Sequence, residues 1–409
     1  MSKTTTRRRI PFTSTQKKIL FALASMVGLR MLGLFLVLPI FTLYGKRFSS
    51  SMTLIGIASG AYALVMAILQ IPMGRLSDRI GRRKVLVMGM TLFSAGSILC
   101  ALPAFFPYSW RIWELIFGRL VQGGGAIISV AFATAADHIE PEQHSMAMAM
   151  LGIPIGVSFV VGIVAGPILA HWFGMAFLFW MTGILALGTD FLLMRYMKDE
   201  APSRQAPAPL AQVFAHPPLI AYAAGGFLMN LFMSTFFFHF PLIVTVQHHL
   251  EMNQYYLLLL PMMLISGVTM FGFSRSTDKG LGRPLSAFAY SLFIPSFILL
   301  FAPAALGMDP KRLFSVLLAG TLFYIGFTGL EPILPSLVSK TSGETTYGTA
   351  LGFYSAAQFL GSAVGYPLSG ILKKYPPEST MWVMMVAAAA GVVIMAATKS
   401  PVLTKTAPQ

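Results

Sequence analysis

Long apolar runs alternate with short polar segments along the whole chain. The runs recur about every 34 residues, and most hold the roughly 20 apolar residues that a membrane-spanning helix requires. Strands of a membrane barrel would instead show alternating segments of about ten residues, which the sequence lacks. The pattern predicts an all-α membrane protein with twelve transmembrane helices, at residues 19–44, 53–73, 85–106, 112–136, 146–171, 174–196, 218–246, 255–274, 285–307, 313–338, 346–372 and 379–398.

One polar, proline-rich stretch interrupts this alternation. Residues 198–218 read KDEAPSRQAPAPLAQVFAHPP and separate six predicted helices from the other six. Proline-rich polar segments act as extended linkers. We therefore expect an N-terminal six-helix bundle at residues 1–197, a cytoplasmic linker at 198–217 and a C-terminal six-helix bundle at 218–409.

The two halves of the chain repeat each other at an offset of 200 residues. Asp78, in GRLSDRIGRRK after the second helix, corresponds to Asp278, in SRSTDKGLGRP after the eighth. The Leu-Gly pair at residues 151–152 recurs at 351–352, and a Gly-xxx-Gly step and a proline follow each copy. Parallel repeats of six helices are a transporter architecture, with a substrate site between the halves.

Composition excludes several classes of protein. Hydrophobic residues make up 56% of the chain and charged residues 11%, whereas an average soluble domain is roughly 25% charged. A mean hydropathy of +0.73 excludes a disordered chain and argues against a globular cytosolic enzyme. The single cysteine excludes a disulfide framework. No nucleotide-binding Walker motif, catalytic triad or metal-ligand spacing is present, so we expect no enzyme activity, cofactor or metal site.

The net charge of +15 has two readings, nucleic-acid binding or membrane topology. Most Lys and Arg residues fall in the loops on the side of the two termini, as in Arg7-Arg8-Arg9 and Arg82-Arg83-Lys84. Cytoplasmic loops carry such an excess. We therefore expect a multi-pass protein with both termini in the cytoplasm, and nucleic acid is not needed as a partner.

Three motifs carry a resemblance to a known family. Residues 74–84 (GRLSDRIGRRK) resemble the signature loop of the major facilitator superfamily, and Arg119 with Gln122-Gly-Gly-Gly resembles its second motif. Gly162-xxx-Gly166-Pro167 resembles the antiporter motif of the drug:proton branch, although His171 stands where that motif usually ends in glycine. The runs SMVGLRMLGLFLVLPIFTLYG, LEPILPSLVSK and YGTALGFYSAAQFLGSAVG look close to bacterial YajR-type drug:proton antiporters.

This resemblance covers essentially the whole chain and implies the major facilitator fold, in the bacterial inner membrane. Some of those relatives carry a soluble C-terminal domain. Only about ten residues follow the last predicted helix here, so we expect no such domain.

The resemblance also implies a conformational latch at the inner membrane surface. In it Asp78 docks on the positive N-terminal end of the eleventh helix, near Thr345, and Asp137 pairs with arginines of the signature loop. The alternative is that these charges only orient helices through the positive-inside effect. The glycines and proline of the antiporter motif allow either close helix packing or a kinked, moving helix. The residues assigned to the latch are Gly74, Asp78, Arg79, Gly81, Arg82, Arg83 and Asp137.

Ionisable groups within a membrane span are costly and are therefore functional candidates. Arg30, Arg119 and Glu331 fall within helices 1, 4 and 10, which together with helix 7 line the central cavity in this superfamily. Glu331 is the leading candidate for a proton carrier. The alternative is that Glu331 forms a structural ion pair with a neighbouring helix. The residues predicted to line the substrate cavity are Arg30, Gln122, Asn230, His239 and Glu331.

Each of the two arginines also has two possible roles. Arg119 resembles the arginine that the family links to proton coupling, by tuning a carboxylate, but it is also suited to bind exposed backbone carbonyls. Arg30 is suited either to attract an anionic substrate group or to pair with an acid. Many drug antiporters of this class place an acid in helix 1, so arginine there argues against a preference for cationic drugs.

These observations favour a proton-coupled secondary transporter that exports drugs or other small amphipathic molecules by rocking of two bundles. The alternatives are transport of an anionic metabolite, sugar or siderophore, and a membrane receptor or scaffold that transports nothing. The expected partners are the lipid bilayer, protons and a small-molecule substrate, and we expect the protein to function as a monomer.

Overall fold

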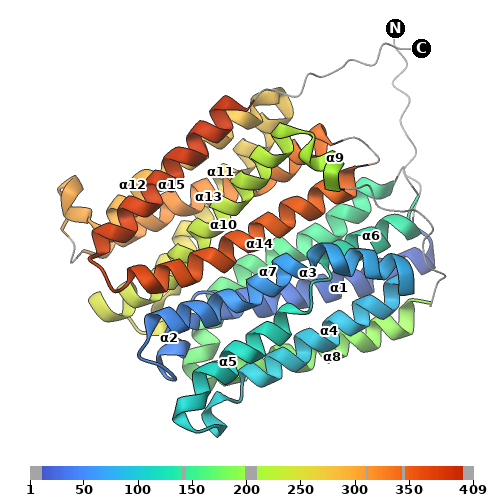
Figure 1. Ribbon diagram of the computed structural model, residues 1–409, viewed down its shortest axis with the longest axis horizontal. Helices are drawn as coiled ribbons and strands as arrows, with labels where there is room; N and C mark the ends of the chain where they lie inside the picture. The colour runs from blue at the N-terminus through green and yellow to red at the C-terminus, as the bar shows by residue number, and fades with distance from the viewer. Residues whose placement is uncertain (1–11, 141–142, 199–209, 310–311, 343–345, 399–409) are drawn as a thin grey trace.

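The structure is a computed structural model that describes residues 12–140, 143–198, 210–309, 312–342 and 346–398. Within these ranges every regular element is a helix, and the long helices run roughly along one direction (Figure 1). The linker expected at 198–217 and the docking position near Thr345 lie largely outside the described residues.

The first half of the chain forms one group of packed helices. Its long helices are α1 (Ser14–Val37), α3 (Met52–Ile80), α4 (Arg82–Cys100), α5 (Tyr108–Gly123), α6 (Ile128–His138), α7 (His144–Phe173) and α8 (Met175–Tyr196). The short α2 (Phe41–Lys46) follows α1.

The second half forms the other group, the upper one in Figure 1. It begins with the short α9 (Leu210–Phe214) and contains α10 (Pro217–Leu242), α11 (Tyr256–Ser276), α12 (Gly282–Phe301), α13 (Leu313–Thr341), α14 (Tyr347–Leu372) and α15 (Pro377–Ala397). Short π-helical segments, Ile243–Gln247 and Thr277–Leu281, extend α10 and join α11 to α12.

The prediction of an all-α membrane protein is confirmed, with two local differences. The predicted helix 19–44 divides after Val37 because Pro39 lacks the N–H that would continue the hydrogen-bond ladder. The predicted helix 112–136 breaks into α5 and α6 at three consecutive glycines, 123–125, each costing about 1 kcal/mol in a helix relative to alanine. Among the described residues, eleven helical spans are long and apolar enough to cross a membrane.

The remaining predicted span, α14, which is the eleventh in chain order, is not among those eleven, although it has 26 residues. Its sequence is interrupted by glycine, serine, tyrosine and glutamine residues. This less apolar helix packs between α3 and α10, where the two halves meet (Figure 1). Its small residues therefore serve close helix contact more than contact with lipid.

We call the face where α1 begins and α15 ends the terminal face, and the opposite one the distal face (Figure 1). The halves touch closely near the distal face. A Cβ atom on Gly60 of α3 would lie 3.0 Å from the Ala363 carbonyl oxygen of α14, and one on Gly56 would collide with the Tyr366 backbone.

Toward the terminal face the same two helices diverge. A Cβ atom on Gly352 of α14 would have its nearest neighbour, the Ile71 Cγ1 atom of α3, at 4.0 Å. For Gly74 and Gly348, which lie still closer to the terminal face, no described atom lies within 4 Å. The halves are thus closed against each other distally and apart at the terminal face.

Candidate functional site

Aromatic rings close the space between the halves on the distal side. Within the second half, Phe236 of α10 stacks on Phe323 of α13, with ring centroids 4.2 Å apart. Phe159 of α7 reaches across from the first half, with ring centroids 6.3 Å from Tyr324 and 6.0 Å from Phe327. We call these five residues the aromatic seal.

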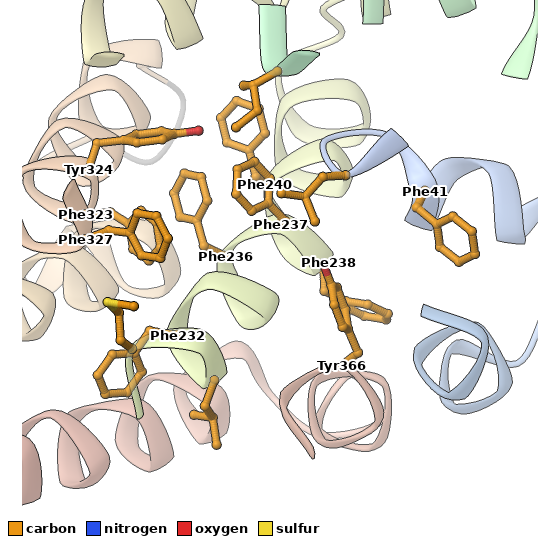
Figure 2. Close-up of a cluster of buried hydrophobic side chains, with 14 of the residues drawn as sticks. Phe41, Phe232, Phe236, Phe237, Phe238, Phe240, Phe323, Tyr324, Phe327 and Tyr366 are labelled. Atoms are coloured by element: carbon orange, nitrogen blue, oxygen red, sulfur yellow. The ribbon is translucent and has the colours of Figure 1, made fainter. Parts of the chain in front are cut away.

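Figure 2 shows the four seal residues of the second half, Phe236, Phe323, Tyr324 and Phe327, among their neighbours. Phe236, Phe237, Phe238 and Phe240 of α10 lie between Phe323 and Phe327 of α13 on one side and Phe41 of α2 on the other. Aromatic pairs in such geometries are worth about 0.5–1.5 kcal/mol each beyond their burial. Only the two pairs made by Phe159 join the halves, and the remaining pairs stabilise the second half itself.

Glu331 lies immediately beyond the seal. It follows Tyr324 by seven residues and Phe327 by four on α13, so the three side chains share one face of the helix. Since α13 runs from the distal to the terminal face, Glu331 sits about one turn closer to the terminal face than the seal, where the halves diverge.

The surroundings of the Glu331 carboxyl group differ from those of its neighbours. Leu330 is fully buried, whereas Glu331 is exposed. The Tyr354 side chain of α14 lies close enough to interact electrostatically with the Glu331 carboxyl group. Within the described part of the chain no hydrogen bond or ion pair to Glu331 is formed, so the structural ion pair considered as an alternative is not observed there.

Arg30 lies inside the first half and is 1% exposed. Its Nη2 atom donates to the Tyr62 hydroxyl at 2.8 Å and lies 2.9 Å from the Met66 sulfur. Its guanidinium carbon is 5.6 Å from the centroid of the Phe93 ring. The Nε and Nη1 atoms have no hydrogen-bond partner among the described residues, and no acid pairs with Arg30 there.

Arg119 of α5 is also buried beside Tyr62, with its guanidinium carbon 4.7 Å from that ring centroid. Its Nη1 atom donates to the Gln122 amide oxygen at 2.5 Å, and Gln122 in turn donates to Ser97 at 2.9 Å. Arg119 therefore bonds a side-chain amide, and the backbone carbonyls considered as its alternative partners are not observed in this role among the described residues.

A narrow pocket at the junction of the halves has Arg119 in its wall. The remaining lining comes from α1, α2 and α3 of the first half and from Tyr366 of the second: Leu34, Val37, Leu38, Phe41, Ser59 and Tyr366. The pocket is apolar apart from Arg119, Ser59 and the tyrosine hydroxyl. It places one cationic group at the junction of the two halves.

Asn230 and His239, also predicted to line the cavity, make their contacts within the second half. The Asn230 amide donates to the Gly226 carbonyl at 3.3 Å, and its oxygen lies 3.4 Å from the Ser362 hydroxyl of α14. The His239 ring is buried against Phe301, with centroids 4.9 Å apart. The structure does not bring these two residues into contact with Arg30, Arg119 or Gln122, and their role in the cavity stays a prediction.

The signature loop forms a charged cluster at the terminal face. Arg82 bonds Asp78 at 2.6 Å, Asp137 of α6 at 2.8 Å and the Ser77 hydroxyl at 2.6 Å. Gly81, at φ 104°, makes the turn between α3 and α4 that a side chain would strain. Of the other residues assigned to the latch, Arg79 is exposed and Arg83 is half-buried.

The docking of Asp78 on α14 is not seen among the described residues. Asp78 pairs with Arg82 instead, and Gly74 has no described atom within 4 Å of a Cβ position. The reason is geometric, since α3 and α14 have already diverged at this depth. A latch between them belongs to an arrangement with the terminal face closed, and it stays a prediction.

Glycines of the antiporter motif bring α7 against α1. A Cβ atom on Gly162 would lie 2.7 Å from the Phe35 Cβ atom, and one on Gly166 would collide with the Leu36 backbone. The equivalent Gly361 in the second half would collide with the Phe227 backbone of α10. The repeated glycines thus allow the same close helix packing in both halves. Pro167 lies within α7 and does not end the helix.

Two residues that organise the site are not indicated by any pattern in the sequence. Tyr62, in the middle of an apolar helix, contacts both buried arginines. Tyr366 closes the pocket from the opposite half. Neither lies in a motif, and a tyrosine in a membrane helix is ordinarily a packing residue. Among the described residues, no group of three His, Cys, Asp or Glu side chains is suited to hold a metal ion.

Comparison with known proteins gives consistent results. Residues 23–366 match the family model described as Major Facilitator Superfamily. The inner membrane transport protein YajR of Escherichia coli is 33% identical over 366 residues, which cover 88% of this chain and 78% of that protein. Multidrug resistance protein 3 of Bacillus subtilis is 29% identical over 134 residues, 32% of this chain and 25% of that protein.

Solved structures agree on the fold. The crystal structure of a D-xylose–proton symporter superimposes with a TM-score of 0.74 at 16% sequence identity, covering 92% of this chain and 96% of the other. At this level of sequence identity, the comparison shows only that the two proteins share a fold.

Proposed function

Because this chain belongs to the major facilitator superfamily of membrane transporters and is not an enzyme, we propose that it couples proton movement to export of small amphipathic molecules. Multidrug resistance proteins among its relatives support this direction and substrate class. The proposal includes alternating access between two six-helix bundles, joined at residues 198–217, in a monomer. The basic loops support a cytoplasmic terminal face, which makes the described arrangement inward-open.

The observation that carries proton coupling is the position of Glu331. Its carboxyl group stands on the helix face that meets the other half, directly beyond the aromatic seal and without an ion-pair partner among the described residues. In this arrangement it is reached from the terminal face. When the halves rock, the seal opens and the same carboxyl group is reached from the distal face, so a proton taken up on one side is released on the other.

Arg119 and Asp78 have supporting roles in this proposal. Arg119 lies where the halves touch distally, so its surroundings change as they rock, and this change favours or disfavours a nearby negative charge. Asp78 stabilises the opposite arrangement by docking on the N-terminal end of α14 once α3 and α14 converge at the terminal face.

The test measures proton-coupled flux in proteoliposomes with ethidium, tetraphenylphosphonium and 2-naphthoate as probes. For the wild type, we expect an imposed pH gradient to accelerate the flux of at least one probe. Glu331→Gln should abolish this acceleration, because the amide takes up no proton, while Glu331→Asp retains part of it. The matched control is Glu378→Gln, an exposed acid at the start of α15 on the distal face.

Two results would contradict the proposal. Full acceleration by the pH gradient in a well-folded Glu331→Gln protein would remove Glu331 as the proton carrier. Absence of wild-type flux for all three probes would count against export of amphipathic molecules.

A further inference from the structure

One buried carboxyl group of the first half has no role in the transport cycle proposed above. Glu114 of α5 is 9% exposed, and neither of its carboxyl oxygens has a hydrogen-bond partner among the described residues. It follows Tyr108, the first residue of α5, by six positions, so it lies about 9 Å along the helix from the distal end. Glu114 is therefore a buried acid on the distal side of the first half, separate from Glu331 of the second half.

The arginines nearest in sequence do not pair with Glu114. Arg111 precedes it by three residues, but the Arg111 guanidinium group donates to the carbonyl oxygens of Phe106 and Ala104, at 2.9 and 3.4 Å. Arg119 follows it by five residues and donates to a side-chain amide instead. The ion pairs found in the described part of the chain do not include Glu114. Its carboxyl group therefore has no cation to neutralise a negative charge.

The other groups that face Glu114 do not compensate a negative charge either. Two titratable side chains interact electrostatically with it, Tyr44 of α2 and Cys100 of α4. The Tyr44 hydroxyl donates to the Cys100 carbonyl oxygen at 3.0 Å and is thus engaged elsewhere. The distal parts of α3 and α4 and the segment 101–107, which pack against α5, contain no charged residue. In such surroundings an ionised carboxylate costs far more free energy than a neutral carboxylic acid.

We propose that Glu114 is a second proton-binding site, which holds a proton while the distal face is closed and loses it when that face opens. Tyr44, which faces Glu114, belongs to α2, and α2 packs against α10 of the second half. When the halves part distally, α10 leaves α2, and water reaches the segment that covers Glu114. The bound proton follows from burial and the missing partners, whereas its link to opening rests on the alternating access proposed above.

The direction of the pH dependence follows from the surroundings of the two forms. The neutral acid fits the closed arrangement and the carboxylate needs water, so removal of the proton favours distal opening. Low pH on the distal side therefore stabilises the closure, and high pH weakens it. Glu114 binds and releases its proton on the same face of the molecule. It thus controls the opening, whereas Glu331 carries the proton from one side to the other.

The first measurement detects the bound proton. Infrared spectra of the purified full-length protein are recorded at about pH 6.5, above the pKa of roughly 4.3 of an exposed glutamate. Part of the carbonyl band of protonated carboxylic acids should disappear in Glu114→Gln and in Glu114→Met. Other buried acids contribute equally to both spectra and cancel in the difference. The matched control is Glu378→Gln, at an exposed acid, which should leave the band unchanged.

The second measurement links this proton to distal opening. In a Cys100→Ala background, which adds no hydroxyl group beside Glu114, Ser59→Cys places a thiol at the junction of the halves, where the native side chain is 3% exposed. A polar maleimide should label this thiol only when the distal face opens. From about pH 6 to about pH 8, the labelling rate relative to that of the Glu114→Gln variant should rise at least about threefold, because glutamine imitates the neutral acid at every pH. The ratio removes the pH dependence of the thiol itself.

Two results would overturn the inference. An unchanged carboxylic acid band in both Glu114→Gln and Glu114→Met would show that Glu114 is ionised. A labelling ratio that stays constant with pH would separate the bound proton from distal opening. If both measurements give the expected result and the wild type shows no proton-coupled flux, the proposed function alone is overturned, so the two failures are distinguishable.

Discussion

Single glycines decide how closely the helices of each half pack. Gly166 allows the α7 backbone to touch Leu36 of α1, and Gly361 allows α14 to touch Phe227 of α10. Gly156, on the same helix as Gly166, has no described atom within 4 Å of a Cβ position. The same residue type therefore has a strict packing role at one position and none at the other.

This difference predicts the effect of a larger side chain. Gly166→Leu should lower the free energy of unfolding by roughly 1–3 kcal/mol or more, because the backbone contact with Leu36 must open. Gly156→Leu should leave stability unchanged or raise it by up to about 1 kcal/mol, since leucine favours a helix over glycine. Thermal unfolding in detergent measures both, and equal melting temperatures would contradict the packing role.

At the scale of elements, the turn between α3 and α4 is tied to α6 by Arg82, which bonds both Asp78 and Asp137. These groups are partly exposed, so each ion pair is worth at most about 1 kcal/mol. An ion pair this weak can exchange one partner for another at a small cost in free energy. Asp78 has Arg82 as its partner in the described arrangement, and in the proposed latch it exchanges Arg82 for the N-terminal end of α14 when α3 and α14 meet.

Asp78→Asn tests this exchange of partners. Loss of the carboxylate should destabilise the arrangement closed at the terminal face, so a cysteine at the position of Gly352 should react about two- to fivefold faster with a polar maleimide. The background is Cys100→Ser, which removes the buried native cysteine. Glu378→Gln should leave the rate unchanged, and an unchanged rate in Asp78→Asn as well would refute the latch.

At the scale of the molecule, contacts between the halves concentrate at the distal face. The aromatic seal, the contact of Gly60 with α14 and the His171–Glu251 pair, whose Nε2 and Oε2 atoms are 4.0 Å apart, all lie distal to Glu331. On α3 and α14 the described glycines nearest the terminal face, Gly74 and Gly348, face open space instead. Along these two helices the described contacts between the halves therefore lie on the distal side.

Cross-linking tests whether this closure must open during transport. In the Cys100→Ser background, Gly60→Cys combined with Ala363→Cys should react rapidly with a short bifunctional maleimide, and flux should then stop because the distal side is locked. The pair Gly74→Cys and Gly348→Cys should react at least about tenfold more slowly, since no described atom lies within 4 Å of either Cβ position. Unimpaired flux after distal cross-linking would contradict alternating access.

Much of the fold could be predicted from the sequence. Apolar runs of membrane length indicated the helices, and the offset of 200 residues indicated two similar halves. The break between α5 and α6 was not predicted, although three glycines mark it. The reason is that hydropathy does not reflect the free-energy cost of placing glycine in a helix. Arg30, Arg119 and Glu331 were found because the membrane makes every charge within a span expensive.

The sequence by itself thus determined the helices, the repeat and the short list of costly charges, since each is a property of local composition. Only the tertiary structure decided which residues those charges meet. Tyr62 joins Arg30 to Arg119, Tyr366 closes the Arg119 pocket from the other half, and Glu331 lies beyond the aromatic seal without an ion-pair partner among the described residues. These relations depend on how helices distant in sequence pack and on which face the halves close, and hydropathy along one chain contains neither.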